Sequence, residues 1–256
     1  MKIRQLGSVV GTLDGHQNLT SFLIDDAIAI DAGALGYLSP LEEQRRVRHV
    51  FLSHSHLDHI GSLPIFLDNV FQPQADPPVI HATAEVFEVL KRDLFNDRVW
   101  PDLSRIAGEE SAFFRYEELR HEGPVEIGDV RITPIPVEHI VPTCGFLIEK
   151  AVGGSALVVS DTGPTERIWE IANQHPDLQY VFLECSFPDA MEWLAIKTCH
   201  LSPALFAREV SKLRVPAEII AVHLKTGFHE RLTTELQGLG LPRLQIGGGD
   251  RVWETR

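Results

Sequence analysis

The sequence predicts an α/β fold in which two β-sheets pack face to face and helices cover their outer faces, a four-layer αββα sandwich. The first observation behind it is that each half of the chain carries short apolar runs of strand length, together with segments that have apolar residues at helical spacing. The second is the length of 256 residues without a Pro/Gly/Ser-rich linker, which favours a single domain over residues 1–256. Local propensity alone leaves other α/β arrangements open.

The first half opens with apolar runs separated by turn signals, which predict antiparallel strands with a tight turn at Asp25 and Asp26. Thr83 is expected to cap a helix, and Pro64 is tolerated in the first turn of another. Residues 95–116 match neither element cleanly and are interpreted as an insertion that walls a pocket. The predicted strands are 3–6, 19–24, 27–33, 49–53 and 79–80, and the predicted helices are 41–47, 61–70 and 83–94.

The second half repeats this pattern of strands and helices. Its glycine run at 247–249 lacks the context of a phosphate-binding loop and is predicted to turn into the last strand. The predicted strands are 125–136, 144–149, 156–160, 180–183, 217–222 and 251–253, and the predicted helices are 164–173, 188–196, 203–213 and 230–237.

Composition and charge exclude several classes of function. The formal net charge of −13 argues against wide contact with a phosphate backbone, so no stable nucleic-acid partner is expected. No span approaches the roughly 18 apolar residues of a membrane helix, and the N-terminus lacks the pattern of a signal peptide. Three scattered cysteines fit a reducing compartment, so we expect a cytoplasmic protein without a membrane partner.

The run from His54 to His59 carries the strongest chemical signal in the chain. Residues two apart in an extended segment point the same way, so His54 and His56 can present their imidazoles to one metal ion. Asp58 and His59 follow where the chain turns into a helix, and they can reach a neighbouring ion. Ordinary polar residues seldom gather so densely at a strand end, and the run therefore favours a metal site.

Three further candidate ligands, His139, Asp161 and His223, stand at the ends of apolar strands. Each alone is equally consistent with a structural role, but as a set they complete a site. With the first run they match the pattern HxHxDH…H…D…H, by which the chain resembles the metallo-β-lactamase superfamily over nearly its whole length. The resemblance implies that fold, with one divalent ion held by His54, His56 and His139, a second held by Asp58, His59 and His223, and Asp161 as the bridge.

A site of this kind predicts a hydrolase. Two divalent ions lower the pKa of a water between them and generate hydroxide at neutral pH. Asp58 is expected to act in catalysis as well as in metal binding. Sites built from His and Asp accept zinc, manganese or iron, and zinc is the ion that we expect first.

Finer motifs resemble the phosphodiesterase branch of the superfamily, especially the class II 3′,5′-cyclic-nucleotide phosphodiesterases, and ribonuclease Z shares part of them. The resemblance implies hydrolysis of a small 3′,5′-cyclic nucleotide, cyclic AMP first, to the 5′-nucleotide, and it implies a homodimer. The chain departs from the signature of the class at Pro64 and at Leu67 and Asp68. The stretches that carry the resemblance are 15–21, 56–62, 95–96, 99–101, 183–187, 199–203 and 222–225.

Phosphodiester hydrolysis that expels a ribose alkoxide needs a proton donor outside the metal ligands. His200 and Glu184 form a histidine and carboxylate pair of this composition, and the family resemblance pairs them as catalytic residues. The alternative is that His200 caps the helix that begins near Ser202.

Four residues are predicted to bind substrate. Lys225, two residues beyond His223, can contact a phosphate oxygen, and Trp100 can stack on a purine. Asn96 belongs to the same insertion as Trp100, and His16 lies in a loop expected near the mouth of the site. The competing interpretations are an exposed lysine, packed loop residues and an exposed histidine.

Three other functions are left as alternatives. A tRNA 3′-processing nuclease is disfavoured by the acidic charge and the lack of a long Gly/Pro-rich basic arm. A lactone, carboxylic ester or thioester hydrolase would not need the acid pair of Glu184 and His200. A non-catalytic scaffold protein would be expected to have lost metal ligands, and this chain has lost none of them.

Overall fold

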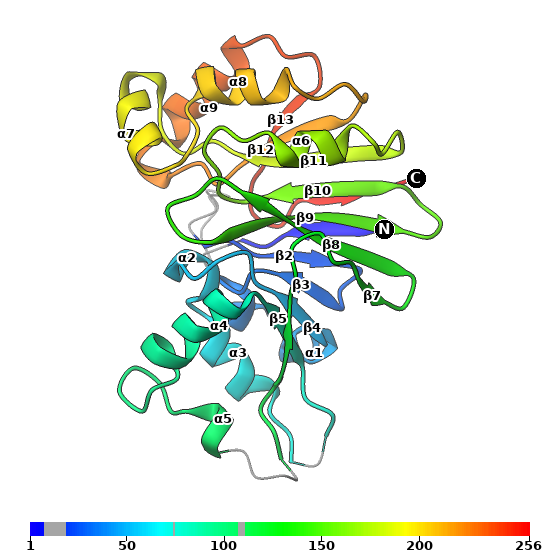
Figure 1. Ribbon diagram of the computed structural model, residues 1–256, viewed down its shortest axis with the longest axis vertical. Coiled ribbons are helices and arrows are strands. Elements are labelled where there is room, and N and C mark those ends of the chain that lie inside the picture. The colour runs from blue at the N-terminus through cyan, green and yellow to red at the C-terminus, as the bar shows by residue number, and fades with distance from the viewer. Residues whose placement is uncertain (8–18, 74, 107–110) are drawn as a thin grey trace.

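The structure, a computed structural model, describes residues 1–7, 19–73, 75–106 and 111–256. Two β-sheets lie together in the middle of the molecule, and helices cover the outer face of each (Figure 1). The predicted α/β sandwich of four layers is confirmed. Among the described residues, no helix combines the length and the apolar character that crossing a membrane requires.

The first sheet has seven strands in the order β14-β1-β2-β3-β4-β5-β6. Strands β14 to β3 pair antiparallel, and strands β3 to β6 pair parallel. The carboxyl ends of the parallel strands β3, β4 and β5 therefore lie side by side at the same edge of the sheet. The bounds are β1 (Lys2–Gln5), β2 (Phe22–Ile24), β3 (Ile28–Ile30), β4 (His49–Phe51), β5 (Val79–Ala82), β6 (Arg115–Glu118) and β14 (Val252–Glu254).

The second sheet also has seven strands, in the order β13-β12-β11-β10-β9-β8-β7. Strands β7 to β10 pair antiparallel and strands β10 to β13 pair parallel. The single strand predicted over 125–136 is wrong, because a turn with Gly128 at a φ of 62° divides it into the hairpin β7–β8. The bounds are β7 (Val125–Ile127), β8 (Val130–Val137), β9 (Thr143–Lys150), β10 (Ser155–Val159), β11 (Leu178–Glu184), β12 (Glu218–Val222) and β13 (Leu244–Ile246).

The helices are short and follow the strands. Thr83 stands at the N-cap of α4 as predicted, but its hydroxyl makes no capping bond, whereas the Ser202 hydroxyl accepts from the Leu205 amide at the start of α8. Leu90–Leu94 forms a π-helical turn, η2, and the 3₁₀ turns are η1 (Leu35–Tyr37), η3 (Asp189–Met191) and η4 (Thr226–Phe228). The α-helices are α1 (Leu41–Arg46), α2 (Leu57–Ile60), α3 (Leu63–Val70), α4 (Ala84–Val89), α5 (Leu103–Ile106), α6 (Arg167–Ala172), α7 (Glu192–Lys197), α8 (Pro203–Val210) and α9 (His229–Gly238).

Three apolar cores separate the four layers. In β10, Ala156 and Val158 join the core between the sheets, whereas Leu157 and Val159 join the core beneath α6, α8 and α9. The third core lies between the first sheet and the helices α3 and α4. Because side chains alternate across a strand, one continuous apolar run fills two cores at once.

The sequence prediction missed two strands, and both lie at sheet edges. The strand β6 falls partly inside the stretch 95–116 that was interpreted as irregular, and β13 follows α9. An edge strand has one unpaired side, and in β6 all but one of the side chains is exposed, so no apolar alternation marks it.

Candidate metal centre

The predicted ligands gather where strands of both sheets end. His54 follows β4, and His56 occupies the N-cap of α2. His139 and Asp161 each come two residues after the end of a strand, β8 and β10, and His223 directly follows β12. The fold thus brings together side chains that are far apart in the sequence.

A first group consists of His54, His56, His139 and Asp161, whose candidate ligand atoms all lie within 4.8 Å of one another. His139 Nε2 is 3.3 Å from His56 Nδ1. Asp161 Oδ2 is 3.6 Å from His54 Nε2 and 3.6 Å from His139 Nε2. The nitrogens of three imidazoles and one carboxylate oxygen therefore face a common point.

A second group consists of Asp58, His59 and His223, with ligand atoms again within 4.8 Å of one another. Here the other oxygen of Asp161 takes part, because Oδ1 lies 3.2 Å from His59 Nε2 and 3.4 Å from His223 Nε2. Asp161 presents one oxygen to each group, which is the arrangement of a bridging carboxylate.

The donor atoms fit divalent cations. His54 Nε2, His59 Nε2 and Asp161 Oδ1 are buried without any hydrogen-bond partner. Buried polar atoms nearly always have a hydrogen-bond partner. Atoms that lack one and face a common point therefore indicate a cation-binding site. Imidazole nitrogens and carboxylate oxygens are the donors that zinc, manganese and iron accept.

The electrostatics favour the protonation states that metal binding needs at two of the ligands, His54 and Asp161. Burial holds the pKa of His54 well below its usual range, so this imidazole is neutral. Burial acts to raise the pKa of Asp161, but His223 and His59 outweigh it and hold that pKa well below the usual range. Asp161 is therefore ionised and His54 neutral, as ligands must be. At His59, burial acts to lower the pKa, but Asp161 and Asp31 outweigh it and raise that pKa well above its usual range, so an ion would displace a proton there.

The sequence prediction missed a residue that supports the ligands, Asp31. Its Oδ2 is 2.7 Å from His59 Nδ1, and its Oδ1 accepts from the backbone N–H of Ser53 at 2.7 Å. This contact holds a proton of His59 on Nδ1, so Nε2, which faces Asp161, is the nitrogen that an ion would bind. Asp31 ends the apolar run 27–30 as Asp161 ends 156–160, so the same strand-end signal could have found it.

His200 and Glu184 form the predicted pair. His200 Nδ1 lies 2.6 Å from Glu184 Oε1, and both residues are buried. Glu184 also accepts from the backbone N–H of Thr162 at 3.0 Å. Burial acts to lower the pKa of His200, but the charge and hydrogen bond of Glu184 outweigh it and raise that pKa.

The pair adjoins the two ligand groups. One nitrogen of His200 lies within 4.8 Å of ligand atoms of both Asp161 and His223. The alternative that His200 caps the following helix is wrong, because the Ser202 side chain makes that capping bond. His200 therefore stands beside the candidate metal centre with its Nδ1 held by a carboxylate.

The predicted substrate-binding residues differ in their surroundings. Lys225 Nζ lies 5.4 Å from the centroid of the Phe187 ring, which is 5.8 Å from that of His200. Asn96 is engaged within its own loop, since its Nδ2 donates to the Arg92 carbonyl at 2.9 Å and its Oδ1 accepts two backbone N–H groups. Trp100 packs against the core between the first sheet and the helices α3 and α4. His16 lies outside the described residues.

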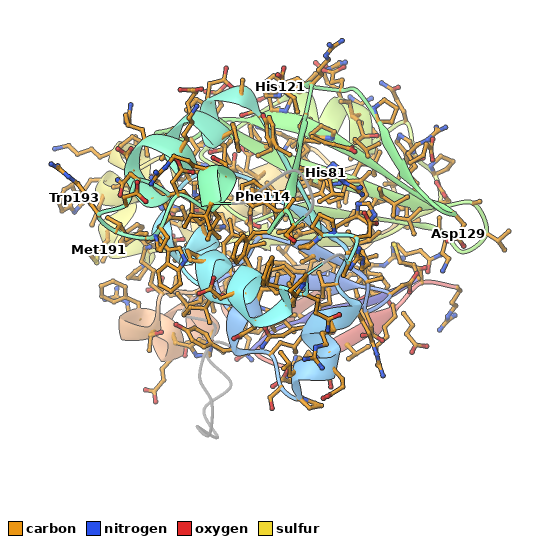
Figure 2. All side chains as sticks on the ribbon, turned by 90° about the horizontal axis from the view of Figure 1, so that it is seen from below. His81, Phe114, His121, Asp129, Met191 and Trp193 are labelled. Atoms are coloured by element: carbon orange, nitrogen blue, oxygen red, sulfur yellow. The ribbon has the colours of Figure 1, made fainter. Side chains whose placement is uncertain are left out.

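Other histidines occupy different parts of the fold. His81 is buried and stacks on Phe51, with ring centroids 4.2 Å apart. Its Nε2 lies 3.0 Å from His49 Nδ1. Figure 2 shows His81 toward the middle of the view and His121 at the periphery. Neither His81 nor His121 belongs to the ligand groups found among the described residues.

Known proteins resemble this chain over most of its length. Residues 22–224 match a family described as "Beta-lactamase superfamily domain". A "Probable 3′,5′-cyclic-nucleotide phosphodiesterase" of Yersinia pestis is 24% identical over 247 residues, which cover 88% of this chain and 68% of that protein. A "Ribonuclease Z" of Enterococcus faecalis is 23% identical in an alignment that covers 93% of this chain and 91% of that protein.

A solved structure agrees with the architecture. Unliganded yeast PDE1 matches with a TM-score of 0.77 at 18% sequence identity, covering 96% of each chain. At this identity the likeness concerns the fold. The family match, in contrast, spans both halves of the chain and includes every candidate ligand from His54 to His223. The chain therefore belongs to the β-lactamase superfamily and has its metallohydrolase fold.

Proposed function

We propose that this chain is a metal-dependent phosphodiesterase that hydrolyses 3′,5′-cyclic nucleotides to 5′-nucleotides, with cyclic AMP as its main substrate. The observation that carries the proposal is the contact of 2.6 Å between His200 and Glu184 next to the candidate metal centre. A ribose alkoxide is a very basic leaving group, so its departure calls for an acid at this place. The name of the Yersinia pestis relative supports the same chemistry.

The two ligand groups would hold two divalent ions, with zinc expected first and manganese or iron as alternatives. When bound, such ions supply an activated water at neutral pH and stabilise the charge that develops on the phosphoryl group. Asp161 would bridge them through its two oxygens.

The chain's own residues would divide the remaining work. Glu184 keeps the Nδ1–H of His200 in place, so that Nε2 can deliver its proton to the departing 3′ oxygen. Burial acts to raise the pKa of Asp58, but its hydrogen bond to His223 and the charges of His59 and His223 together outweigh it and hold that pKa well below its usual range. Asp58 is therefore a weak base, better suited to binding a metal ion and orienting a water molecule than to removing a proton from that water.

Substrate contacts belong to the same proposal. The Phe187 ring contacts both the Lys225 ammonium and the His200 ring, so Lys225 lies on the side of the site where His200 stands. From there Lys225 would contact a phosphate oxygen of the substrate. Base recognition by Trp100 and Asn96 stays a prediction, as do the homodimer and the lack of a stable nucleic-acid partner. We place the activity in the cytoplasm, a choice that the three free cysteines support.

The proposal is tested by steady-state kinetics on purified protein loaded with zinc. His200→Ala should lower kcat for cyclic AMP by about 10²- to 10⁴-fold, because the general acid is lost while the ligands remain. Asp161→Ala should abolish turnover together with bound zinc. His175→Ala, which removes a histidine paired with Glu149 outside the centre, is the matched control and should leave kcat unchanged. Cleavage of other diesters but of neither cyclic AMP nor cyclic GMP would refute the cyclic-nucleotide assignment.

A second candidate is a tRNA 3′-processing nuclease, which the near full-length match to ribonuclease Z favours. The net charge of −13 opposes it, because binding a phosphate backbone requires basic side chains. Cleavage of a precursor tRNA at a rate above that for cyclic AMP would replace the first proposal with this one. A lactone and thioester panel in the same assay tests the remaining hydrolase class.

A further inference from the structure

Ser186 is a buried residue two positions after Glu184, and its hydroxyl contacts both the acid pair and a candidate metal ligand. Its Oγ lies 2.7 Å from Glu184 Oε2 and 3.0 Å from His223 Nδ1. A longer contact of 3.3 Å reaches His200 Nδ1. Neither the predicted ligands nor the predicted catalytic residues include this serine.

The donors and acceptors of these contacts follow from elementary chemistry. A hydroxyl has one proton, and an ionised carboxylate can only accept, so Ser186 donates to Glu184. The Oγ lone pairs then accept from Nδ1–H of His223. His223 is thereby held with its Nδ1–H toward Ser186, so Nε2, which lies 3.0 Å from Asp58 Oδ2, is the nitrogen that would bind an ion in place of a proton.

Glu184 consequently orients two histidines with different tasks. Its Oε1 accepts directly from His200 Nδ1, at 2.6 Å. Its Oε2 reaches His223 indirectly, through the Ser186 hydroxyl. Each carboxylate oxygen also accepts one backbone N–H, from Thr162 at 3.0 Å and from Leu201 at 3.3 Å, so the carboxylate has little freedom to move.

The first half of the chain contains a similar serine and carboxylate with a different set of partners. Ser53 Oγ donates to Asp31 Oδ2 at 2.8 Å and lies 2.9 Å from His54 Nδ1. Asp31 binds His59 directly, at 2.7 Å. The Asp31–Ser53 pair thus orients two candidate metal ligands, whereas the Glu184–Ser186 pair orients one metal ligand and the acid.

We infer that Ser186 is a positioning residue that couples His223 of the candidate metal centre to the His200–Glu184 acid through one shared hydroxyl. The part that concerns His200 rests on the proposed phosphodiesterase function. The part that concerns His223 rests only on the ligand groups. The two parts therefore call for separate measurements on the same variant, Ser186→Ala.

The first measurement is zinc affinity, determined by competition with a chromophoric chelator on the full chain. Ser186→Ala should weaken the binding of one of two zinc ions by about 10- to 100-fold, as loss of a partner of a metal-bound histidine does. Ser53→Ala should weaken zinc binding to a similar extent. Unchanged zinc affinity in Ser186→Ala, with the wild-type circular dichroism spectrum, would overturn the inference for His223.

The second measurement compares leaving groups at saturating zinc. Cyclic AMP expels an alkoxide that needs a proton, whereas bis(p-nitrophenyl) phosphate expels an aryloxide that does not. The substitution Ser186→Ala should lower kcat for cyclic AMP by a factor at least about 10 times larger than for the aryl diester, because the acid His200 is misplaced. Ser53→Ala, which has no link to His200, should lose the same factor on both substrates.

The outcomes separate the inference from the proposed function. Equal losses on both substrates in Ser186→Ala would overturn the link to His200, since a merely structural defect acts on both. If the wild-type protein cleaves the aryl diester but not cyclic AMP, the proposed function fails and the His200 part fails with it. The zinc affinity of Ser186→Ala still decides the His223 part in that case.

Discussion

Three residues around the candidate metal centre have a left-handed backbone conformation, which residues with a Cβ atom rarely adopt. Asp31, Cys199 and His223 have positive φ angles of 61°, 51° and 56°. Such a conformation costs roughly 1–2 kcal/mol for a residue with a Cβ atom. Each of the three supplies a group to the centre, since Asp31 binds His59, the Cys199 carbonyl oxygen lies 2.9 Å from His139 Nδ1, and His223 is itself a candidate ligand. Backbone strain is thus present at residues that set the orientation of the ligands.

A prediction at the residue scale concerns His81 and acid stability. Burial, together with the neighbouring His49, lowers the pKa of His81 to about 4. Because this value lies below the ordinary 6.5, the stability that neutral His81 contributes is complete above about pH 6.5 and is lost as the pH falls toward 4. The contribution is about 3 kcal/mol at most.

His81→Phe retains a ring that can stack on Phe51 but cannot take up a proton. We expect the free energy of unfolding in urea to fall less between pH 7.5 and pH 5 for this variant than for the wild-type protein. His175→Ala, which removes a partly exposed histidine, is the control and should keep the wild-type dependence. An identical fall in His81→Phe and wild type would contradict the assignment.

At the scale of elements, the loop after β3 packs tightly against the start of α2. The Gly33 N–H donates to the Thr20 carbonyl at 3.0 Å, and the Thr20 N–H donates to the Asp58 carbonyl at 2.7 Å. A Cβ atom on Gly33 would overlap this Asp58 carbonyl oxygen. The glycine is therefore required by the close approach of two backbones beneath the candidate ligands Asp58 and His59.

Gly33→Ala is predicted to destabilise the protein by about 1–3 kcal/mol and to weaken zinc binding, because the α2 backbone must shift. Thermal unfolding of the metal-free protein and zinc competition measure the two effects. Gly238→Ala adds a Cβ that meets no atom within 4 Å, so it should leave both quantities unchanged or slightly raise stability. Wild-type zinc affinity and stability in Gly33→Ala would show that α2 is free to move.

At the scale of the whole molecule, the candidate metal centre joins the two halves of the chain. His54, His56, Asp58 and His59 come from the half that forms most of the first sheet, and His139, Asp161 and His223 come from the half that forms the second. The core between the sheets also combines residues of both, such as Phe22 and Phe182, whose ring centroids are 5.4 Å apart. Bound ions would therefore tie together halves that already share a core.

Metal loading is accordingly predicted to stabilise the fold. An ion that binds only the folded state at 100 times its dissociation constant adds about 2.7 kcal/mol to the free energy of unfolding. Differential scanning fluorimetry should show a higher melting temperature with zinc and a return to the metal-free value after chelation. Asp161→Ala should show little response, because it removes an oxygen from each ligand group. An equal rise in wild type and Asp161→Ala would place the stabilising ion elsewhere.

The sequence by itself determined the fold class, most strands and the candidate ligands. His54 and His56 share a short extended segment, and His139, Asp161 and His223 each follow an apolar strand. Such features depend on local chain geometry, in which side-chain direction alternates and a polar residue marks a strand end. Local patterns were therefore sufficient to predict the strands and the candidate ligands, whereas the choice of the four-layer arrangement also drew on the resemblance to the superfamily.

Only the tertiary structure decided how these residues divide into groups and what holds them. The oxygens of Asp161 face different histidines because the two sheets pack at a particular register, and no spacing in the sequence encodes that distance. The parallel pairing of β11 with β12 in the second sheet brings Ser186 between Glu184 and His223. The order of strands in the first sheet places β6 at its edge, where a strand can stay polar. Contacts between distant segments arise from the packing of layers, whereas the sequence pattern reports only which layer each side chain faces.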